Sequence, residues 1–189
     1  MGLPRRVGIE LPAWIDEVVG PRRALPGTEE KMALVIRLAG ANIEREKGGG
    51  PFGAAVFRSD TGELVSVGVN SVVRLHNSAL HAEVVALMMA HEALAVHSFR
   101  LPGVPPLELV SSCDPCVMCL GTTAWSGVNR LVTGASKEDA EDLGFDEGPV
   151  TADSYVQLQR HGVEVVRGVL REEARVVLRR YQELGRPIY

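Results

Sequence analysis

Residue types that bind transition metals cluster in two short segments of the sequence. His81 is followed two positions later by Glu83, and Cys116 and Cys119 lie in the segment Pro115-Cys116-Val117-Met118-Cys119. One imidazole and two thiolates are ligands that suit zinc, and three protein ligands leave a fourth position open for water, as in catalytic zinc sites. The spacing therefore predicts one zinc ion per chain, held by His81, Cys116 and Cys119.

Glu83 is too close to His81 along the chain to be an efficient co-ligand, so we expect it to carry protons to and from water at the metal. The alternatives are a structural zinc or a cluster of buried thiols. A lone His-x-Glu or a lone Cys-x-x-Cys would not distinguish these alternatives from a catalytic zinc site. Both motifs in this order favour a catalytic zinc. Cys113 also forms a Cys-x-x-Cys with Cys116, but Pro115 places it on an incoming strand, so we expect a small buried residue there.

Each metal-binding segment stands at the start of a predicted helix. Hydrophobic spacing and capping residues predict helices that begin near Thr28, at His81 and at Asp114, with Asp114 as the N-cap and Pro115 in the first helical position. A last helix is predicted over 171–184, with short helical pieces between 136 and 160 and a polar loop over 70–80. Strands are predicted over 54–57, 64–69, 107–111, 130–134 and 163–169.

This alternation of strands and helices predicts an α/β fold, a three-layer α/β/α sandwich around a central five-stranded mixed sheet. The chain has 189 residues, of which 46% are hydrophobic and 23% charged, values typical of a single globular domain. Residues 1–27, rich in Pro, Gly and Arg, are interpreted as an arm that packs on the domain formed by residues 28–189.

Charge and hydropathy exclude some partners. The 20 Lys and Arg are outnumbered by 24 Asp and Glu, so a basic surface for nucleic acid is not expected. The longest uncharged run, 115–129, is shorter than the roughly 20 residues of a membrane span. No secretory signal is apparent, and three clustered cysteines favour metal binding over disulfides. We therefore expect a cytoplasmic protein that binds neither membranes nor nucleic acid.

Several segments together resemble the cytidine deaminase superfamily, and in particular its guanine deaminase branch. The zinc motif is shared across the superfamily, whereas Trp125 and the Gly-Phe-Asp-Glu segment indicate the guanine deaminase branch. The resemblance implies a cytidine deaminase-like fold and a homodimer. It is carried by Pro51-Phe52-Gly53-Ala54-Ala55-Val56, Asn70, His81-Ala82-Glu83, Pro115-Cys116-Val117-Met118-Cys119, Trp125 and Gly144-Phe145-Asp146-Glu147-Gly148-Pro149.

The resemblance also implies roles for residues outside the metal cluster. Asn70 would hydrogen-bond the edge of a purine, and its amide, both donor and acceptor, suits the mixed edge of guanine. Phe52 and Trp125 would pack against the ring, and Ala82 would contact the substrate. Glu147 would act as a second acid that assists the loss of ammonia. The alternatives are a turn residue for Asn70, ordinary core for Phe52 and Trp125, and a solvated acidic face for Glu147.

These observations predict a zinc-dependent hydrolytic deaminase of a free aminated heterocycle, with guanine converted to xanthine and ammonia. The partner is then a small-molecule nucleobase. Alternatives with the same chemistry are deamination of an aminotriazine such as ammeline, a modified purine, guanosine, cytidine or tRNA adenosine. A zinc-stabilised binding module without activity is disfavoured, because a structural zinc needs no acid at Glu83.

Overall fold

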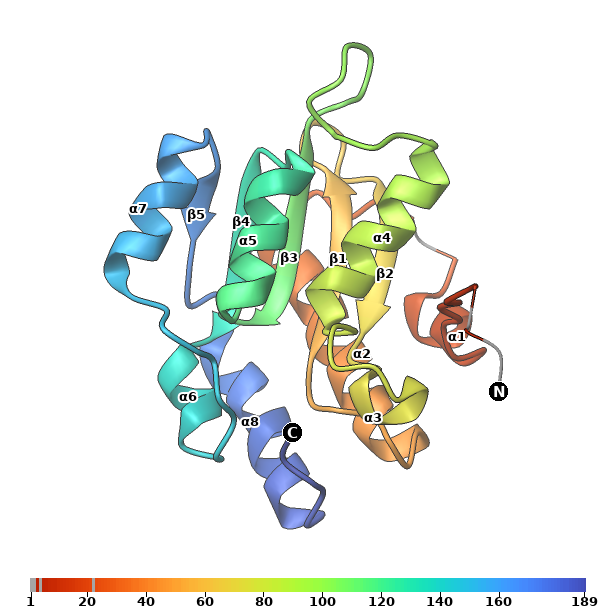
Figure 1. The fold of residues 1–189 in the computed structure, drawn as a ribbon, viewed down its shortest axis with the longest axis vertical. Coiled ribbons are helices and arrows are strands. Elements are labelled where there is room, and N and C mark those ends of the chain that lie inside the picture. The colour runs from red at the N-terminus through yellow and green to blue at the C-terminus, as the bar shows by residue number, and fades with distance from the viewer. Residues whose placement is uncertain (1–2, 4, 22) are drawn as a thin grey trace.

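The computed structural model describes residues 3, 5–21 and 23–189, and this part of the chain folds around a mixed sheet with strand order β2-β1-β3-β4-β5 (Figure 1). β1 pairs antiparallel with β2 and β3, whereas β3, β4 and β5 run parallel. The predicted α/β sandwich with a five-stranded mixed sheet is confirmed. The strands are β1 (Gly53–Arg58), β2 (Leu64–Val69), β3 (Leu107–Cys113), β4 (Arg130–Ala135) and β5 (Glu164–Val166).

Helices cover both faces of the sheet. One layer, in front of the sheet in Figure 1, contains α4, α5 and α7, and the opposite layer contains α1, α2 and α8. Because both faces are covered, β1 and β3 are almost entirely buried, without the alternation of buried and exposed residues that a one-sided sheet shows. The helices are α1 (Ile15–Val19), α2 (Thr28–Arg45), α3 (Val72–Leu75), α4 (Ala82–Leu94), α5 (Val117–Ser126), α6 (Lys137–Glu141), α7 (Ala152–Arg160) and α8 (Arg171–Glu183).

The start of α5 differs from the prediction. Its N-cap is Cys116, not Asp114, and the helix begins at Val117. Asp114 is buried and its carboxylate accepts a hydrogen bond from Thr133 Oγ1 (2.6 Å) and pairs with the guanidinium of Arg167. These tertiary partners compete with local capping, so β3 runs on to Cys113 and Asp114 and Pro115 form a short connection before the helix.

Two short helices were not predicted. α3 lies inside the expected polar loop 70–80, and α1 lies inside the expected arm. Ile15 and Val19 of α1 pack into the apolar cluster of α2, β1 and β2, and Leu25 N–H donates to Gly62 O (2.8 Å). The division between an arm (1–27) and a domain (28–189) stays a prediction, and residues 1, 2, 4 and 22 of the arm lie outside the described residues.

The site described below lies where β1 begins and where β2 and β3 end. β1 is antiparallel to β3, so its first residues reach the same edge as the last residues of β3, with Ala54 opposite Ser111. Parallel and antiparallel pairing meet at β3, and a change of strand direction in an open α/β sheet leaves a crevice there. Among the described residues, no helix is both long enough and apolar enough to cross a bilayer.

Candidate active site

The three predicted metal ligands meet where α4 and α5 begin. His81 is the N-cap of α4, Cys116 is the N-cap of α5, and Cys119 lies in the first turn of α5. One ligand atom from each lies within 4.8 Å of the other two, with 3.5 Å between His81 Nδ1 and Cys116 Sγ. Two thiols and an imidazole around one centre form a donor set that suits zinc, so these residues fit the metal.

The electrostatics of the two thiols favour binding of a cation. A hydrogen bond from the Cys119 thiol, with help from His81, lowers the pKa of Cys116 to about 4. The same bond to Cys116, together with burial, raises the pKa of Cys119. The N-terminus of α5 adds positive potential at both sulfurs. The thiol of Cys116 is therefore the more easily deprotonated of the two, and zinc binding must displace the proton of Cys119.

Glu83 lies beside the metal ligands in the first turn of α4, with 6% of its surface exposed. Its Oε1 accepts a hydrogen bond from Ser111 Oγ (3.1 Å) and its Oε2 accepts one from the Cys119 thiol (3.4 Å). Burial, and then the negative charge of Cys116, raise the pKa of Glu83 above its usual range. A raised pKa makes the carboxylate a stronger base, which suits a group that takes a proton from water.

A buried cavity opens next to this cluster and collects most of the predicted site. With Tyr189 in place its free space is about 20 Å³, roughly the room for one water molecule. The predicted residues Phe52, Asn70, His81, Glu83, Cys116 and Glu147 line it together with Asp114, Phe145, Asp146 and Tyr189.

Asn70 follows β2 and presents one unpaired donor to the cavity. Its backbone N–H donates to Phe52 O (3.0 Å), and its Oδ1 accepts from Val72 N–H (3.3 Å). Because a backbone N–H is a donor, the amide oxygen must face it, which fixes the orientation of the amide. Its Nδ2 is buried and has no hydrogen-bond partner among the described residues. Asn70 Nδ2 is therefore free to donate, and Oδ1 keeps a second lone pair, so the expected match to the mixed edge of guanine stays a prediction.

Glu147 is buried, with 7% of its surface exposed, so the solvated acidic face is excluded for this residue. Its backbone oxygen accepts from Val117 N–H (3.1 Å), which ties the segment to the start of α5. Burial, and then the negative charge of Cys116, raise the pKa of Glu147 to about 8. Gly148 has φ +70°, and a Cβ there would lie 2.8 Å from Val117 Cγ1, so this close approach requires glycine.

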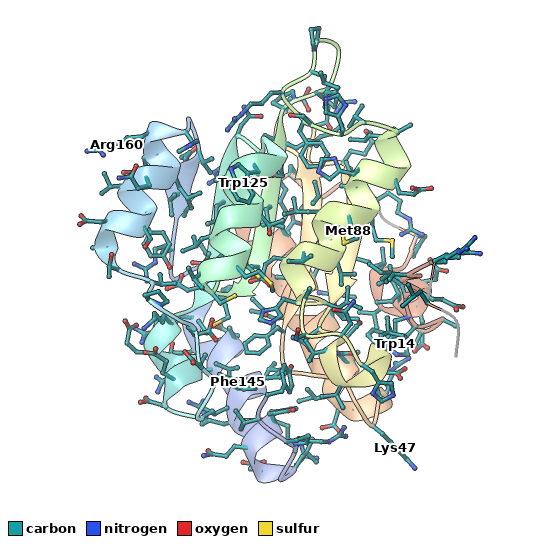
Figure 2. All side chains as sticks on the ribbon, viewed as in Figure 1. Trp14, Lys47, Met88, Trp125, Phe145 and Arg160 are labelled. Atoms are coloured by element: carbon teal, nitrogen blue, oxygen red, sulfur yellow. The ribbon has the colours of Figure 1, made fainter. Side chains whose placement is uncertain are left out.

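Two predicted substrate contacts do not reach this cavity. Trp125 is 81% exposed near the end of α5, and Figure 2 shows it apart from Phe145. It stands six residues beyond Cys119, roughly 9 Å farther along the helix axis, so it does not pack on a ring in the cavity of its own chain. Ala82 is fully buried in the core between α4 and the sheet and does not line the cavity. Neither residue lines the cavity of a single chain, and both substrate contacts stay predictions.

Aromatic residues that the sequence did not single out take the place expected for Trp125. The Phe145 ring lies 5.0 Å from that of Phe52 at 71°, and 5.5 Å from that of Tyr189 at 76°. Phe145 belongs to the segment that carried the resemblance. Its place between Gly144 and an acidic pair is the sequence feature that could have identified it as a residue of the cavity. The resemblance implies a C-terminal segment that covers the pocket, but the sequence left open whether Tyr189 contributes to it.

Residues 185–189, the C-terminal strap, hold Tyr189 in this position. Arg186 donates three hydrogen bonds of 2.7 Å, to the backbone oxygens of Ile43, Glu46 and Lys47 at the end of α2. Tyr181 Oη donates to Pro187 O (2.7 Å). The strap thus satisfies carbonyls at the C-terminus of α2 that have no partner within the helix.

Comparison with known proteins places this site among deaminases. The cytidine and deoxycytidylate deaminase zinc-binding region matches residues 27–135. A guanine deaminase from Bacillus subtilis (strain 168) is 33% identical over 117 residues, which cover 62% of this chain and 69% of that protein. A tRNA-specific adenosine deaminase from the same organism is 30% identical over 148 residues, 77% of this chain and 84% of that protein. The structure of guanine deaminase from Nitrosomonas europaea matches with a TM-score of 0.90 at 40% identity, over 97% of this chain and 100% of that one.

Proposed function

Because this chain belongs to the cytidine and deoxycytidylate deaminase zinc-binding family, we propose that it converts guanine and water to xanthine and ammonia. That it is a zinc-dependent hydrolytic deaminase follows from the family and from the metal cluster. The proposal concerns the substrate and the residues that act on it. It is carried by one observation, the buried cavity in which the metal ligands, Glu83 and the unpaired amide donor of Asn70 face the same small space.

A zinc ion held by His81, Cys116 and Cys119 supplies a Lewis acid that makes water a nucleophile at neutral pH. Glu83 accepts a proton from that water as its oxygen bonds to the ring carbon that carries the amino group. Glu83 then delivers this proton to the ring nitrogen beside that carbon. Both steps use a carboxyl whose raised pKa allows it to hold the proton in between.

Glu147 completes the proton balance. Its pKa of about 8 keeps it protonated at neutral pH, so it can protonate the departing amine. The carbon–nitrogen bond breaks, ammonia leaves, and Glu147 recovers a proton from the hydroxyl that becomes the new carbonyl. The sum is guanine plus water giving xanthine plus ammonia.

The shape of the cavity supports a free base over a larger substrate. Phe52 and Phe145 supply apolar ring faces, and Asn70 Nδ2 supplies a donor for a carbonyl oxygen or ring nitrogen of the base. Because the free space is about 20 Å³ with Tyr189 in place, even a free base requires the strap to move aside. A tRNA substrate would also have to approach the acidic segment 138–147, which repels phosphate.

An ammonia-release assay tests the substrate. The zinc-loaded protein is incubated with guanine, ammeline, isoguanine, adenine, cytosine, guanosine, cytidine and a tRNA that carries the target adenosine. We expect release from guanine, weaker or no release from adenine and cytosine, and none from tRNA. Release from another compound with none from guanine would reject the guanine assignment and leave the zinc deaminase intact.

We also infer a homodimer and a reducing, cytoplasmic location. The exposed Trp125 shares α5 with the half-exposed Val117, and Met88 is half-exposed on the neighbouring α4. A large exposed aromatic residue next to apolar neighbours is typical of an interface. The three cysteines are free thiols, and oxidation of Cys116 or Cys119 would destroy the metal site.

A further inference from the structure

A buried asparagine outside the predicted site lies directly beneath the amide that faces the cavity. Asn42 is in α2 and is fully buried beside Ala39 and Ile43. Its Nδ2 donates to the backbone oxygens of Gly50 and Asn70, both at 2.9 Å. Its Oδ1 has no partner among the described residues, so this amide is only partly compensated for the water it has lost. An apolar residue would avoid that cost, which points to a role for the two donated bonds.

Those two bonds fix the backbone from which the Asn70 side chain projects. The backbone N–H of Asn70 is held by Phe52 O, its backbone oxygen by Asn42, and its side-chain oxygen by Val72 N–H. Gly50, the second residue that Asn42 holds, approaches so closely that a Cβ there would lie 2.9 Å from Asn70 Cγ. With these groups engaged, the Asn70 amide is held in one orientation, and its Nδ2 is the polar atom of this cavity-lining residue that has no partner among the described residues.

We propose that Asn42 is a positioning residue for substrate recognition, which holds Asn70 so that Nδ2 meets an acceptor on the edge of the base. Asn42 does not line the cavity, so it acts through Asn70 alone. This inference rests on the proposed function, because the contact between Asn70 and the substrate is part of it. The donor that Asn42 orients selects ligands that place a carbonyl oxygen or an unprotonated ring nitrogen at that point.

A double-mutant cycle on ammonia release from guanine tests this role. Asn42→Leu keeps the branched shape of the side chain, at a larger volume, and removes both polar atoms; we expect kcat/KM to fall about tenfold, mainly through KM, with zinc content unchanged. In an Asn70→Ala background, the same substitution should change kcat/KM less than about twofold, because the amide that it positions is gone. If the reductions in kcat/KM from the two single substitutions simply multiplied in the double variant, the proposal would be overturned.

A matched control separates positioning from loss of stability. The side chain of Asn129 also hydrogen-bonds the backbone: its Oδ1 accepts from Leu107 N–H (3.2 Å) at the opposite end of the sheet. Asn129→Leu should lower the melting temperature while kcat/KM for guanine stays unchanged. If Asn42→Leu does not fold, Asn42→Ser retains one donor and should give a smaller loss with the same dependence on Asn70. Equal kcat/KM for Asn42→Ser and wild type would also overturn the proposal.

A crystal structure of the Asn42 variant gives a readout that does not depend on turnover. We expect the Asn70 amide to be displaced or to adopt more than one orientation. An Asn70 that keeps its Val72 bond and its direction would overturn the proposal, whatever the substrate. Failure of the proposed function is distinct, because the wild-type protein would then release no ammonia from guanine. The cycle is in that case measured with the heterocycle that the ammonia assay identifies.

Discussion

Two buried carboxyl groups flank the metal ligands, and their surroundings give them different tasks. Glu83 is held by the Ser111 hydroxyl and the Cys119 thiol, so its oxygens point at the metal centre. Glu147 lies across the cavity, and its pKa of about 8 keeps it protonated at neutral pH. Burial and the negative charge of Cys116 raise the pKa of both carboxyls, so it is their different positions beside the cavity that allow them to divide the acid and base work.

Replacing Glu83 by glutamine tests the proton-transfer role. The amide is nearly isosteric and cannot move a proton, so we expect Glu83→Gln to fold and bind zinc while kcat falls by about 10²- to 10⁴-fold. Elemental analysis and ammonia release measure the two properties. Ser111→Ala is the matched control, because it removes a hydrogen bond to Glu83 but leaves the carboxyl in place. A Glu83→Gln enzyme with kcat near the wild-type value would refute the role.

Cys113 is expected to be dispensable for metal binding. It lies outside the three-residue cluster, its thiol donates to Ser136 O (3.5 Å), and burial raises its pKa well above the usual range. We therefore expect stoichiometric zinc in Cys113→Ala and loss of zinc in Cys119→Ala, measured by elemental analysis of both proteins. Loss of zinc from Cys113→Ala would show that the ligand set is wrong.

At the scale of elements, the site depends on segments that are tied down by charged side chains. Asp139 of α6 is 5% exposed and accepts hydrogen bonds from Arg171 of α8 (2.8 and 3.0 Å) and from Ser136 N–H (2.8 Å). This contact fixes α6, and α6 begins the segment that carries Phe145 and Glu147. The bond from Arg171 lowers the pKa of Asp139 to about 2.

This shift predicts a pH-dependent stability. A carboxyl with a lowered folded-state pKa stabilises the fold above its unfolded pKa of about 3.9, and the contribution is lost as the pH falls towards 2. Because the two arginines that pair with Asp139, Arg171 and Arg175, are partly exposed, we expect this contribution to the free energy of unfolding to be about 1–2 kcal/mol. Urea unfolding at pH 5, 3.5 and 2.5 should show a steeper loss for wild type than for Asp139→Asn. Zinc contributes equally to the stability of the two proteins, so it cancels in the comparison. If the free energy of unfolding fell equally with pH in both, the role of Asp139 would be contradicted.

The C-terminal strap is expected to open more often when its anchor is removed. Arg186→Ala removes three bonds to the end of α2, so carboxypeptidase should release Tyr189 about tenfold faster or more. KM for guanine should fall, because the base can enter only when the strap has moved aside. Arg160→Ala on α7 is the control, since that cation lies far from the strap (Figure 2). Equal release of Tyr189 from all three proteins would exclude Arg186 as the anchor.

At the scale of the whole molecule, the exposed apolar side chains of α4 and α5 predict association of two chains. Light scattering at micromolar concentration should give twice the 20.4 kDa mass of one chain. Trp125→Arg places a charge in the expected interface and should shift the protein towards the monomer, whereas Val176→Arg, on the exposed face of α8, should not. A wild-type mass of about 20 kDa would refute the dimer.

The sequence by itself determined the metal chemistry and the class of fold. His81, Cys116 and Cys119 could be assigned because each motif is local, and its spacing fixes where the side chains lie on a helix start whatever the rest of the chain does. The alternation of strands and helices was likewise readable, and β2 was predicted with its observed bounds. Such features depend on residues within a few positions of one another.

Only the tertiary structure decided which groups face the substrate cavity. Phe145 in place of Trp125, the free donor of Asn70, the burial of Glu147 and the position of Tyr189 arise from contacts between segments far apart along the chain. The prediction of Asp114 as the N-cap of α5 was wrong for the same reason. Asp114 pairs with Arg167, a partner that no local sequence pattern reveals. Local spacing sets the direction of a side chain within its element, but its solvation and partners depend on how the elements pack.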